Sequence, residues 1–210
     1  MSFFKGLFLI LIGGRFKKKS NDFDKLSDEE LVDKILNTKN TLLFSVLYDR
    51  YSKKIYNKCY SFSINEEEAK DLTQDVFVKL FTKLNTFQGK SKFSTWVYSF
   101  TYNFCINYVN RDSGRKLNNL SESLDHHDYH LSEIEDVDDN DFFGMRVEKL
   151  KQSLELIDPA EKAILLLKYQ DNISINELQV LYNIGESAVK MRLKRAKVKV
   201  LEAYNKINND

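Results

Sequence analysis

The stretch from Asn172 to Ala203 reads NISINELQVLYNIGESAVKMRLKRAKVKVLEA. Ser174 and Glu177 form a capping box ahead of an apolar run, so we expect a helix to begin there and to extend to about Tyr182. The next segment is Asn183-Ile184-Gly185, and asparagine and glycine both tolerate the backbone conformations of a sharp turn. The stretch therefore predicts a helix, a short turn and a second helix.

The second helix combines one apolar face with a strongly basic remainder. Its apolar residues recur at helical spacing and therefore share a face: Val189, Leu193, Ala196 and Val200. No acidic residue occurs between Ser187 and Leu201, while the other faces carry Lys190, Arg192, Lys194, Arg195, Lys197 and Lys199. This is the helix-turn-helix arrangement, whose second helix fits the DNA major groove. A solvated terminal helix is the alternative, but such helices usually mix charge signs, so DNA binding is the better interpretation.

The composition of the 210 residues indicates a helix-rich protein of one or two domains, because it contains only one proline and seven glycines. Cys59 and Cys105 each lie in a helical apolar pattern, so we expect buried reduced thiols and a cytoplasmic location. The sequence contains no zinc-ligand spacing, Walker loop or dinucleotide-binding glycine motif. We therefore expect no metal and no other cofactor.

Residues 1–24 are expected to form an N-terminal extension. The apolar run from Leu7 to Ile12 is far shorter than the about 20 residues that span a bilayer, so no stable membrane insertion is expected. A poorly ordered extension is the preferred interpretation. A membrane-surface anchor flanked by Lys17–Lys19 is the alternative.

Three further helices are predicted in the first half of the chain. Ser27 and Glu30 form a capping box before the first, the second runs from about Thr41 to Tyr60, and Asn65 caps the third. The expected inner face of the second helix consists of Phe44, Leu47, Tyr48, Tyr51 and Ile55. The expected inner face of the third helix consists of Ala69, Leu72, Val76, Leu80 and Leu84, which leaves Asp71, Gln74, Asp75 and Lys79 outside.

The third helix begins with Glu66, Glu67 and Glu68, and Asp71 and Asp75 follow them. A metal-dependent nuclease could be built on such carboxylates. No histidine lies near them in sequence, however, and an acidic first turn is what the helix dipole favours, so we expect no enzyme. A second rival is a stand-alone regulator that would bind operators through the basic helix and use the front half for dimerisation or ligand binding.

A basic loop and an aromatic helix come next. In the loop, Gly89 ends the preceding helix and Ser91 is flanked by two lysines. The fourth helix reads WVYSFTYNFCINYVNR and begins at Trp96. Aromatic and amide side chains beside a basic loop suit stacking with unpaired bases. Core packing is the alternative, and we expect it for most of these aromatics, including Phe100 and Phe104.

The strings DLTQDVFVKLF, FQGKSKFSTWVYSFTYNFCINYV and ISINELQVLYNIGESAVKMRLKRA resemble regions two and four of RNA polymerase sigma factors, and the layout is similar to the extracytoplasmic-function (ECF) group. The resemblance implies an all-α fold of two small helical domains. Region two would occupy residues 25–115 and region four residues 147–206, joined by a flexible acidic linker over 116–146. The implied function is to bind core RNA polymerase, direct it to specific promoters and assist DNA melting.

The resemblance also implies roles for individual residues. The group that falls on the surface for the clamp helices of the β′ subunit is Asp71, Gln74, Asp75 and Lys79. The group that falls on the surface for the melted minus-ten element is Lys90, Ser91, Lys92, Trp96, Asn103 and Arg111. The group that falls on the recognition helix for the minus-thirty-five element is Ser187, Lys190, Met191, Arg192, Lys194 and Arg195. The implied partners are core polymerase (β′ clamp helices and β flap) and promoter DNA, and an anti-sigma factor is a further candidate.

Asn103 falls on the family position that lines a pocket for a flipped base, and an amide offers both a donor and an acceptor for that purpose. A local hydrogen bond within the helix is the alternative role. The family often has arginine where Ser99 and Tyr102 stand and aspartate where Asn107 stands, so fewer phosphate contacts are expected here. Met191 lacks the bidentate donors of arginine and would read shape or a thymine methyl group.

The segment from Ser121 to Phe142 carries nine carboxylates and no lysine or arginine, which predicts an extended, self-repelling linker. Its histidines are His126, His127 and His130, for which we prefer solvation over a metal site. By the resemblance, this linker threads the nucleic-acid channel of the polymerase. After it, Asp158, Pro159 and Glu161 are expected to open region four as a capped helix, with Ala163, Ile164, Leu166 and Leu167 packing behind the helix-turn-helix.

Overall fold

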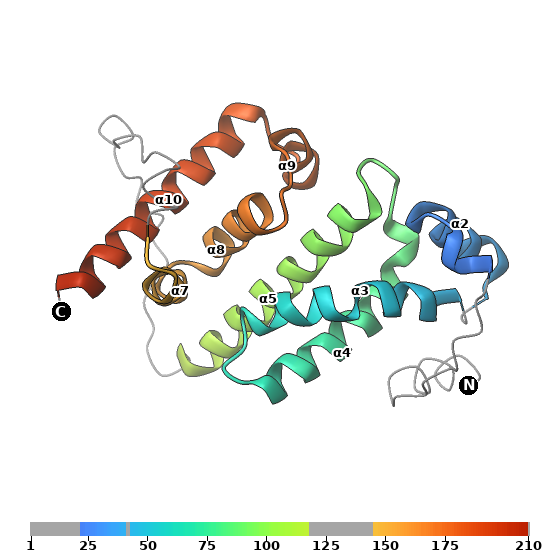
Figure 1. Ribbon diagram of the computed structural model, residues 1–210, viewed down its shortest axis with the longest axis horizontal. Helices are drawn as coiled ribbons and strands as arrows, with labels where there is room; N and C mark the ends of the chain where they lie inside the picture. Colours follow the sequence, from blue (N-terminus) through green and yellow to red (C-terminus); the bar gives the residue numbers. More distant parts are fainter. Residues whose placement is uncertain (1–21, 41–42, 118–144, 210) are drawn as a thin grey trace. The chain divides into compact units, whose positions relative to one another are not determined.

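The computed structural model describes residues 22–40, 43–117 and 145–209, and every regular element in these ranges is a helix (Figure 1). The predicted all-α class and its two helical blocks are therefore confirmed. Contacts divide the chain into two compact units, Met1–Cys105 and Ile106–Asp210, with α5 (Phe93–Leu117) running across the division. Residues 1–21 of the predicted N-terminal extension and the acidic stretch with its three histidines lie outside the described residues, whereas residues 22–24 of that extension belong to a short 3-10 turn.

The N-terminal unit consists of α2 (Asp28–Thr38), α3 (Phe44–Tyr60), α4 (Glu66–Lys83) and the start of α5, with the short 3-10 turns η1 (Asp22–Lys25) and η3 (Leu84–Thr86). Its core is apolar and aromatic, and the largest fully buried side chains include Phe44, Tyr51, Ile55, Phe77, Leu80 and Phe93. Rings from different helices meet edge to face, as expected for aromatic pairs in a core.

Two of the predicted helix starts in this unit are confirmed. The Ser27 N–H donates to Glu30 Oε2 at 2.8 Å and the Glu30 N–H donates to Ser27 Oγ at 3.2 Å, which completes the capping box of α2. The Glu68 N–H donates to the Asn65 side chain at 2.9 Å, so Asn65 caps α4. The predicted inner face of α3 is correct except at Tyr48, which is half-buried.

The fourth helix begins three residues earlier than predicted, at Phe93, because α2 supplies its cap. Glu29 Oε1 accepts the Phe93 N–H at 2.8 Å, although the two residues are 64 positions apart. The neighbouring Asp28 pairs with Arg50 at 2.6 Å and accepts the Tyr51 hydroxyl. Burial, followed by this carboxylate, raises the pKa of Tyr51 above its usual range. The first turn of α2 therefore connects three helices.

Alanine at Glu29 is expected to destabilise the N-terminal unit by about 1 kcal/mol, the usual cost of losing a helix cap. Urea unfolding followed by Trp96 fluorescence measures this, since Trp96 is the single tryptophan of the chain and lies one turn into α5. Glu67→Ala is the matched control, because Glu67 is exposed in the first turn of α4. Equal unfolding midpoints for Glu29→Ala and the control would contradict a capping role.

Both cysteines are buried free thiols, as predicted, and they come from different helices. The Cys105 thiol hydrogen-bonds the Cys59 sulfur, and this bond is the main cause that lowers the pKa of Cys59 despite its burial. The Thr73 hydroxyl acts on the same sulfur. The three side chains therefore join α3, α4 and α5 in the interior of the N-terminal unit.

The C-terminal unit contains α7 (Val147–Leu156), α8 (Pro159–Leu165), a π turn η4 (Leu166–Gln170), α9 (Ile175–Tyr182) and α10 (Glu186–Asn209). The long helix α10 packs against α7, α8 and α9. At its far end, the Arg146 N–H donates to the Tyr204 hydroxyl at 3.2 Å, which ties the start of α7 to α10.

The start of α8 is only partly as predicted. The Ala160 N–H donates to Asp158 Oδ1 at 2.7 Å and Pro159 occupies the first turn, as expected. Glu161 does not complete a capping box; its carboxylate instead pairs with Lys199 of α10 at 2.6 Å. Leu166 is half-buried and does not lie in the core as predicted. Residues 162–165 are all buried, because neighbouring helices surround this short helix. In the described ranges we find no helix with the length and apolarity needed to cross a membrane.

Candidate polymerase and nucleic-acid interfaces

The outer side of α4 carries the residues predicted to meet the polymerase. Asp71, Gln74, Asp75 and Lys79 are all exposed, while Leu72, Val76 and Leu80 on the opposite side are buried in the core. The spacing of three, four and eight residues places the four exposed side chains along one side of the helix. The core packing of α4 thus presents a polar strip of two carboxylates, one amide and one ammonium group.

The carboxylates at the start of α4 serve the helix itself. Glu68 accepts the Ile64 N–H, and Glu66 lies 3.8 Å from the ammonium of Lys70. Within the described ranges, no group of three histidine, cysteine or acidic side chains is arranged to hold a metal ion. These contacts are those of an acidic helix N-terminus, which the helix dipole favours.

The basic loop before α5 turns at Gly89, which has a φ of +68°. Lys90 and Lys92 are exposed, and the Ser91 hydroxyl donates to the Lys92 carbonyl oxygen at 3.3 Å. The Trp96 N–H donates to that same carbonyl at 3.1 Å, so the loop leads directly into the first turn of α5. Two exposed ammonium groups therefore lie in the loop that leads into α5.

Alanine at Gly89 is expected to destabilise the N-terminal unit by about 1–2 kcal/mol, because an L-residue is strained in this left-handed conformation. A Cβ at this position would meet no atom within 4 Å, so the cost is that of the backbone alone. Urea unfolding monitored by Trp96 fluorescence gives the free energy. The matched control is Gln88→Ala, since Gln88 is exposed and its φ is not positive. Equal free energies of unfolding for the two variants would contradict the prediction.

An aromatic cluster anchors the start of α5. The Trp96 ring lies 5.6 Å from Phe87, 5.6 Å from Phe93 and 5.5 Å from Phe100, measured between centroids. Phe93 is fully buried, whereas the other three rings are half-buried. The cluster therefore fixes Trp96 in place and still leaves part of its ring at the surface, where a base could stack.

One side of α5 extends this aromatic surface. Asn103 lies seven residues after Trp96, on the same side of the helix, and it is exposed. Phe100 and Phe104 flank it and are half-buried, so the expectation of core packing holds for only part of each ring. Further along the helix, Arg111 is exposed, and its Nε donates to the Asn107 carbonyl oxygen at 3.2 Å.

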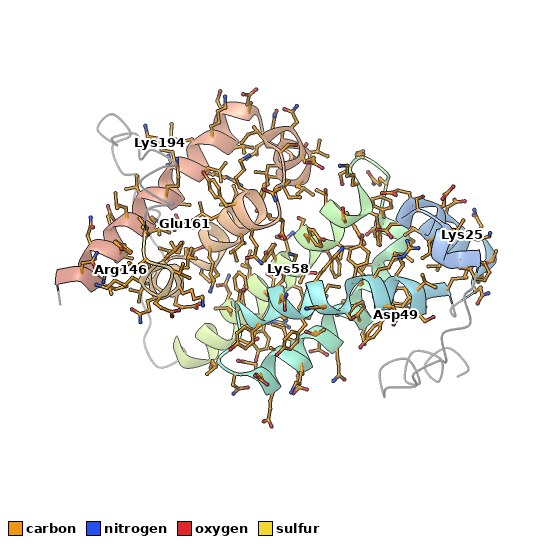
Figure 2. The ribbon with its side chains drawn as sticks, viewed as in Figure 1. Lys25, Asp49, Lys58, Arg146, Glu161 and Lys194 are labelled. Atoms are coloured by element: carbon orange, nitrogen blue, oxygen red, sulfur yellow. The ribbon has the colours of Figure 1, made fainter. Side chains whose placement is uncertain are left out.

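Ser99 and Tyr102, at which the family often has arginine, face the core instead. Tyr102 is 1% exposed and its ring lies 5.9 Å from that of Phe62. The ammonium group of Lys58 lies 4.0 Å from the ring centroid of Tyr98 and 5.3 Å from that of Tyr102. Figure 2 labels Lys58 on α3. These two positions of α5 therefore carry core side chains beside a buried lysine, and neither of them places a cation at the surface.

The predicted helix-turn-helix is present. The Ser174 N–H and hydroxyl both donate to Glu177 Oε2, at 3.0 and 2.8 Å, and begin α9. Asn183 ends this helix in the left-handed conformation, with a φ of 51°. Gly185 does not have a positive φ, so only the asparagine of this turn uses the conformational freedom that was expected of both. The Gly185 carbonyl oxygen accepts the Val189 N–H at 3.1 Å, in the first turn of α10.

Helix α10 buries the predicted apolar face, and the six predicted DNA-binding residues lie at different angles around its axis. Opposite the buried Val189 and Leu193 lie the residues at the centre of the outer face: Ser187, Met191, Lys194 and Arg195. Lys190 and Arg192 lie on the two flanks. Figure 2 shows Lys194 on α10 and Glu161 on α8, whose carboxylate pairs with Lys199 rather than with the outer face.

Known proteins similar to this chain match the segments that carry the exposed strip of α4 and the aromatic side of α5. The family model "Sigma-70 region 2" matches residues 47–115, which contain α4, the basic loop and the aromatic side of α5. The ECF RNA polymerase sigma factor SigW of Bacillus subtilis is 28% identical over 171 residues, which cover 73% of this chain and 84% of SigW. The chain belongs to the ECF sigma factors of RNA polymerase. As a sigma factor, it directs RNA polymerase to promoters and is an initiation factor rather than an enzyme.

Other relatives of this sigma factor extend the similarity over both units. The ECF sigma-E factor of Haemophilus influenzae is 22% identical, over 83% of this chain and 93% of its own. Two solved structures share the fold. The sigma factor RpoE of Bartonella quintana has a TM-score of 0.53 and 17% identity, covering 77% of this chain and 96% of its own. CnrH has a TM-score of 0.55 and 18% identity, covering 85% of this chain and 97% of its own.

Two residues that contact the flanking cations of α10 were not identified from the sequence: Glu186 at the start of α10 and Tyr182 at the end of α9. Glu186 pairs with Lys190 at 2.6 Å, and its spacing of four residues could have revealed this contact. The Tyr182 ring lies 5.6 Å from the guanidinium carbon of Arg192. Tyr182 stands across the turn on α9, so no helical spacing in the sequence connects it to Arg192.

Proposed function

We propose that this sigma factor binds core polymerase through the strip formed by Asp71, Gln74, Asp75 and Lys79 on α4. Residues 25–115 would act as region two, 116–146 as the linker through the polymerase channel, and 147–206 as region four, which would meet the β flap. The observation that supports this assignment is that all four strip residues are exposed on a helix whose opposite side is firmly packed. A rigid helix presents such a strip with little loss of entropy on binding.

We further propose that the basic loop and the outer side of α5 capture the melted minus-ten element. Lys90 and Lys92 would meet phosphates, Trp96 would stack on a base, and Asn103 would hydrogen-bond the edge of a flipped base. Extracting a base costs a few kcal/mol, which stacking and edge hydrogen bonds together can offset. Arg111, further along α5, would add a phosphate contact, while Ser91 would order the loop.

In region four, α10 would read the minus-thirty-five element in the major groove. Ser187, Met191, Lys194 and Arg195 would face the bases, and Lys190 and Arg192 would meet the flanking phosphates. A thioether cannot donate hydrogen bonds, so Met191 would contact a thymine methyl group. With so few base contacts, the free protein would bind promoter DNA weakly and with a steep salt dependence.

The setting we propose is the cytoplasm, where the polymerase acts, with an anti-sigma factor as a regulatory partner. The solved structure of the Bartonella quintana RpoE is a complex with the anti-sigma factor NepR, and that of CnrH is a complex with the cytosolic domain of CnrY. A similar partner for this chain is supported by the shared fold.

Transcription in vitro with core polymerase on genomic DNA tests the proposed function. Adding the full chain is expected to create start sites that core enzyme alone does not use, each preceded by a common pair of promoter elements. Footprints at these promoters should require core polymerase. Protection of the same DNA by the chain alone, with no new start sites, would instead identify a stand-alone regulator.

A further inference from the structure

The two flanking cations of α10 are held in different ways. Lys190 forms an ion pair with Glu186 on its own helix, at 2.6 Å, and the carboxylate competes there with any phosphate. Arg192 has an aromatic partner, since its guanidinium carbon lies 5.6 Å from the Tyr182 ring centroid. That distance is within the range of a cation–π contact. The aromatic partner leaves the positive charge of Arg192 uncompensated.

Glu186 and Tyr182 also differ in which N–H donors of the bound cation they leave available for a phosphate. A carboxylate occupies the N–H donors of a cation, whereas a ring contacts the face of the guanidinium plane. The five donors at the edge of that plane then remain able to bind a phosphate. Arg192 is exposed, and Tyr182 is half-buried as the last residue of α9. The fixed ring can therefore restrict the arginine rotamers before DNA arrives, which reduces the entropy lost on binding.

Tyr182 is suited to this role because its side chain stays neutral and is partly buried. Burial raises the pKa of Tyr182 to about 12, against the opposing effect of Arg192. The contact with Arg192 is therefore that of a cation with a neutral ring at ordinary pH. Asn183 directly after it adopts the left-handed conformation that ends α9, so the backbone that carries the ring is also defined.

We propose that Tyr182 is a positioning residue that presents the Arg192 guanidinium to a DNA phosphate at the edge of the minus-thirty-five major groove. The flank of α10, and not its central outer face, carries Arg192, which favours a phosphate over a base as its ligand. The proposal rests on the proposed function of α10 as the recognition helix. It adds a residue of α9 that touches no DNA itself and acts through Arg192.

A double-mutant cycle tests this in the holoenzyme, with core polymerase, the full chain and a promoter mapped as above. The variants are Tyr182→Leu, Arg192→Ala, their combination, and Tyr182→Phe as the matched control that keeps the ring. Tyr182→Leu is expected to weaken promoter binding about 2–5-fold, the range of an exposed cation–π contact. Tyr182→Phe is expected to bind as the unmodified chain does. In the Arg192→Ala background, Tyr182→Leu should cause no further loss.

Three results would overturn the proposal. An equal loss from Tyr182→Leu in both backgrounds would show that the ring only packs the helices. A loss in Tyr182→Phe as large as in Tyr182→Leu would assign the effect to the hydroxyl. Unchanged promoter affinity in Arg192→Ala would show that Arg192 makes no DNA contact, so the proposed function of this residue would fail together with the positioning role. The first two results, by contrast, would overturn only the role of Tyr182. Tyr182→Met replaces Tyr182→Leu if circular dichroism shows that the leucine variant is unfolded, and the same outcomes apply.

Discussion

Simultaneous alanine substitution of Asp71, Gln74, Asp75 and Lys79 is expected to weaken binding to core RNA polymerase about 100-fold. This corresponds to about 3 kcal/mol, a loss that one or two well-placed interface residues can produce. The fold should survive, because all four side chains are exposed and surface substitutions usually change stability by less than about 0.5 kcal/mol each. Fluorescence anisotropy with labelled core enzyme measures the affinity directly.

The matched control for this variant changes Asp49, Lys53 and Asn57 to alanine. These residues are exposed on α3 in the same unit, at spacings of four, and they also combine one acidic, one basic and one amide side chain. We expect the control to retain core binding within about twofold. Intact core binding by the α4 variant would contradict the assigned interface, and an equal loss in both variants would show that the effect is not specific to α4.

The second large effect is expected when both flanking cations of α10 are removed. The double variant Lys190→Ala, Arg192→Ala is expected to lose transcription from promoters that need the minus-thirty-five element, with about 10–100-fold weaker promoter binding by the holoenzyme. Binding to core polymerase through the strip on α4 should be unchanged, because Lys190 and Arg192 lie on the exposed flanks of α10 and are not part of that strip. Each lost phosphate contact should also make the slope of log K against log salt shallower by about 0.9.

Lys151→Ala with Lys206→Ala is the control for net charge. Both lysines are exposed in the same unit, on α7 and near the end of α10, outside the segment from Ser187 to Arg195. We expect this pair to retain the start sites and nearly the full salt slope. Equal losses from the two double variants would indicate a general effect of charge, and undiminished start sites in the first would remove the recognition role of α10.

The local features of this fold could be predicted from the sequence because they depend on residues within one or two helical turns. The caps at Ser27, Asn65 and Ser174 follow from a side chain and a backbone N–H a few residues apart. The buried face of α10 and the exposed strip of α4 follow from helical periodicity. The boundary of α5 could not be predicted in this way, since its cap comes from Glu29 on another helix.

In the candidate sites, too, some features follow from the sequence alone and others depend on the tertiary structure. The sequence by itself determined the helical class, the two blocks, and which residues of α4 and α10 reach the surface. Only the tertiary structure decided that Glu161 pairs with Lys199, that Tyr102 lies in the core beside Lys58, and that Tyr182 contacts Arg192. The physical reason is that a helical pattern specifies the direction of a side chain around its own axis, whereas its partner depends on which other helix packs against that side.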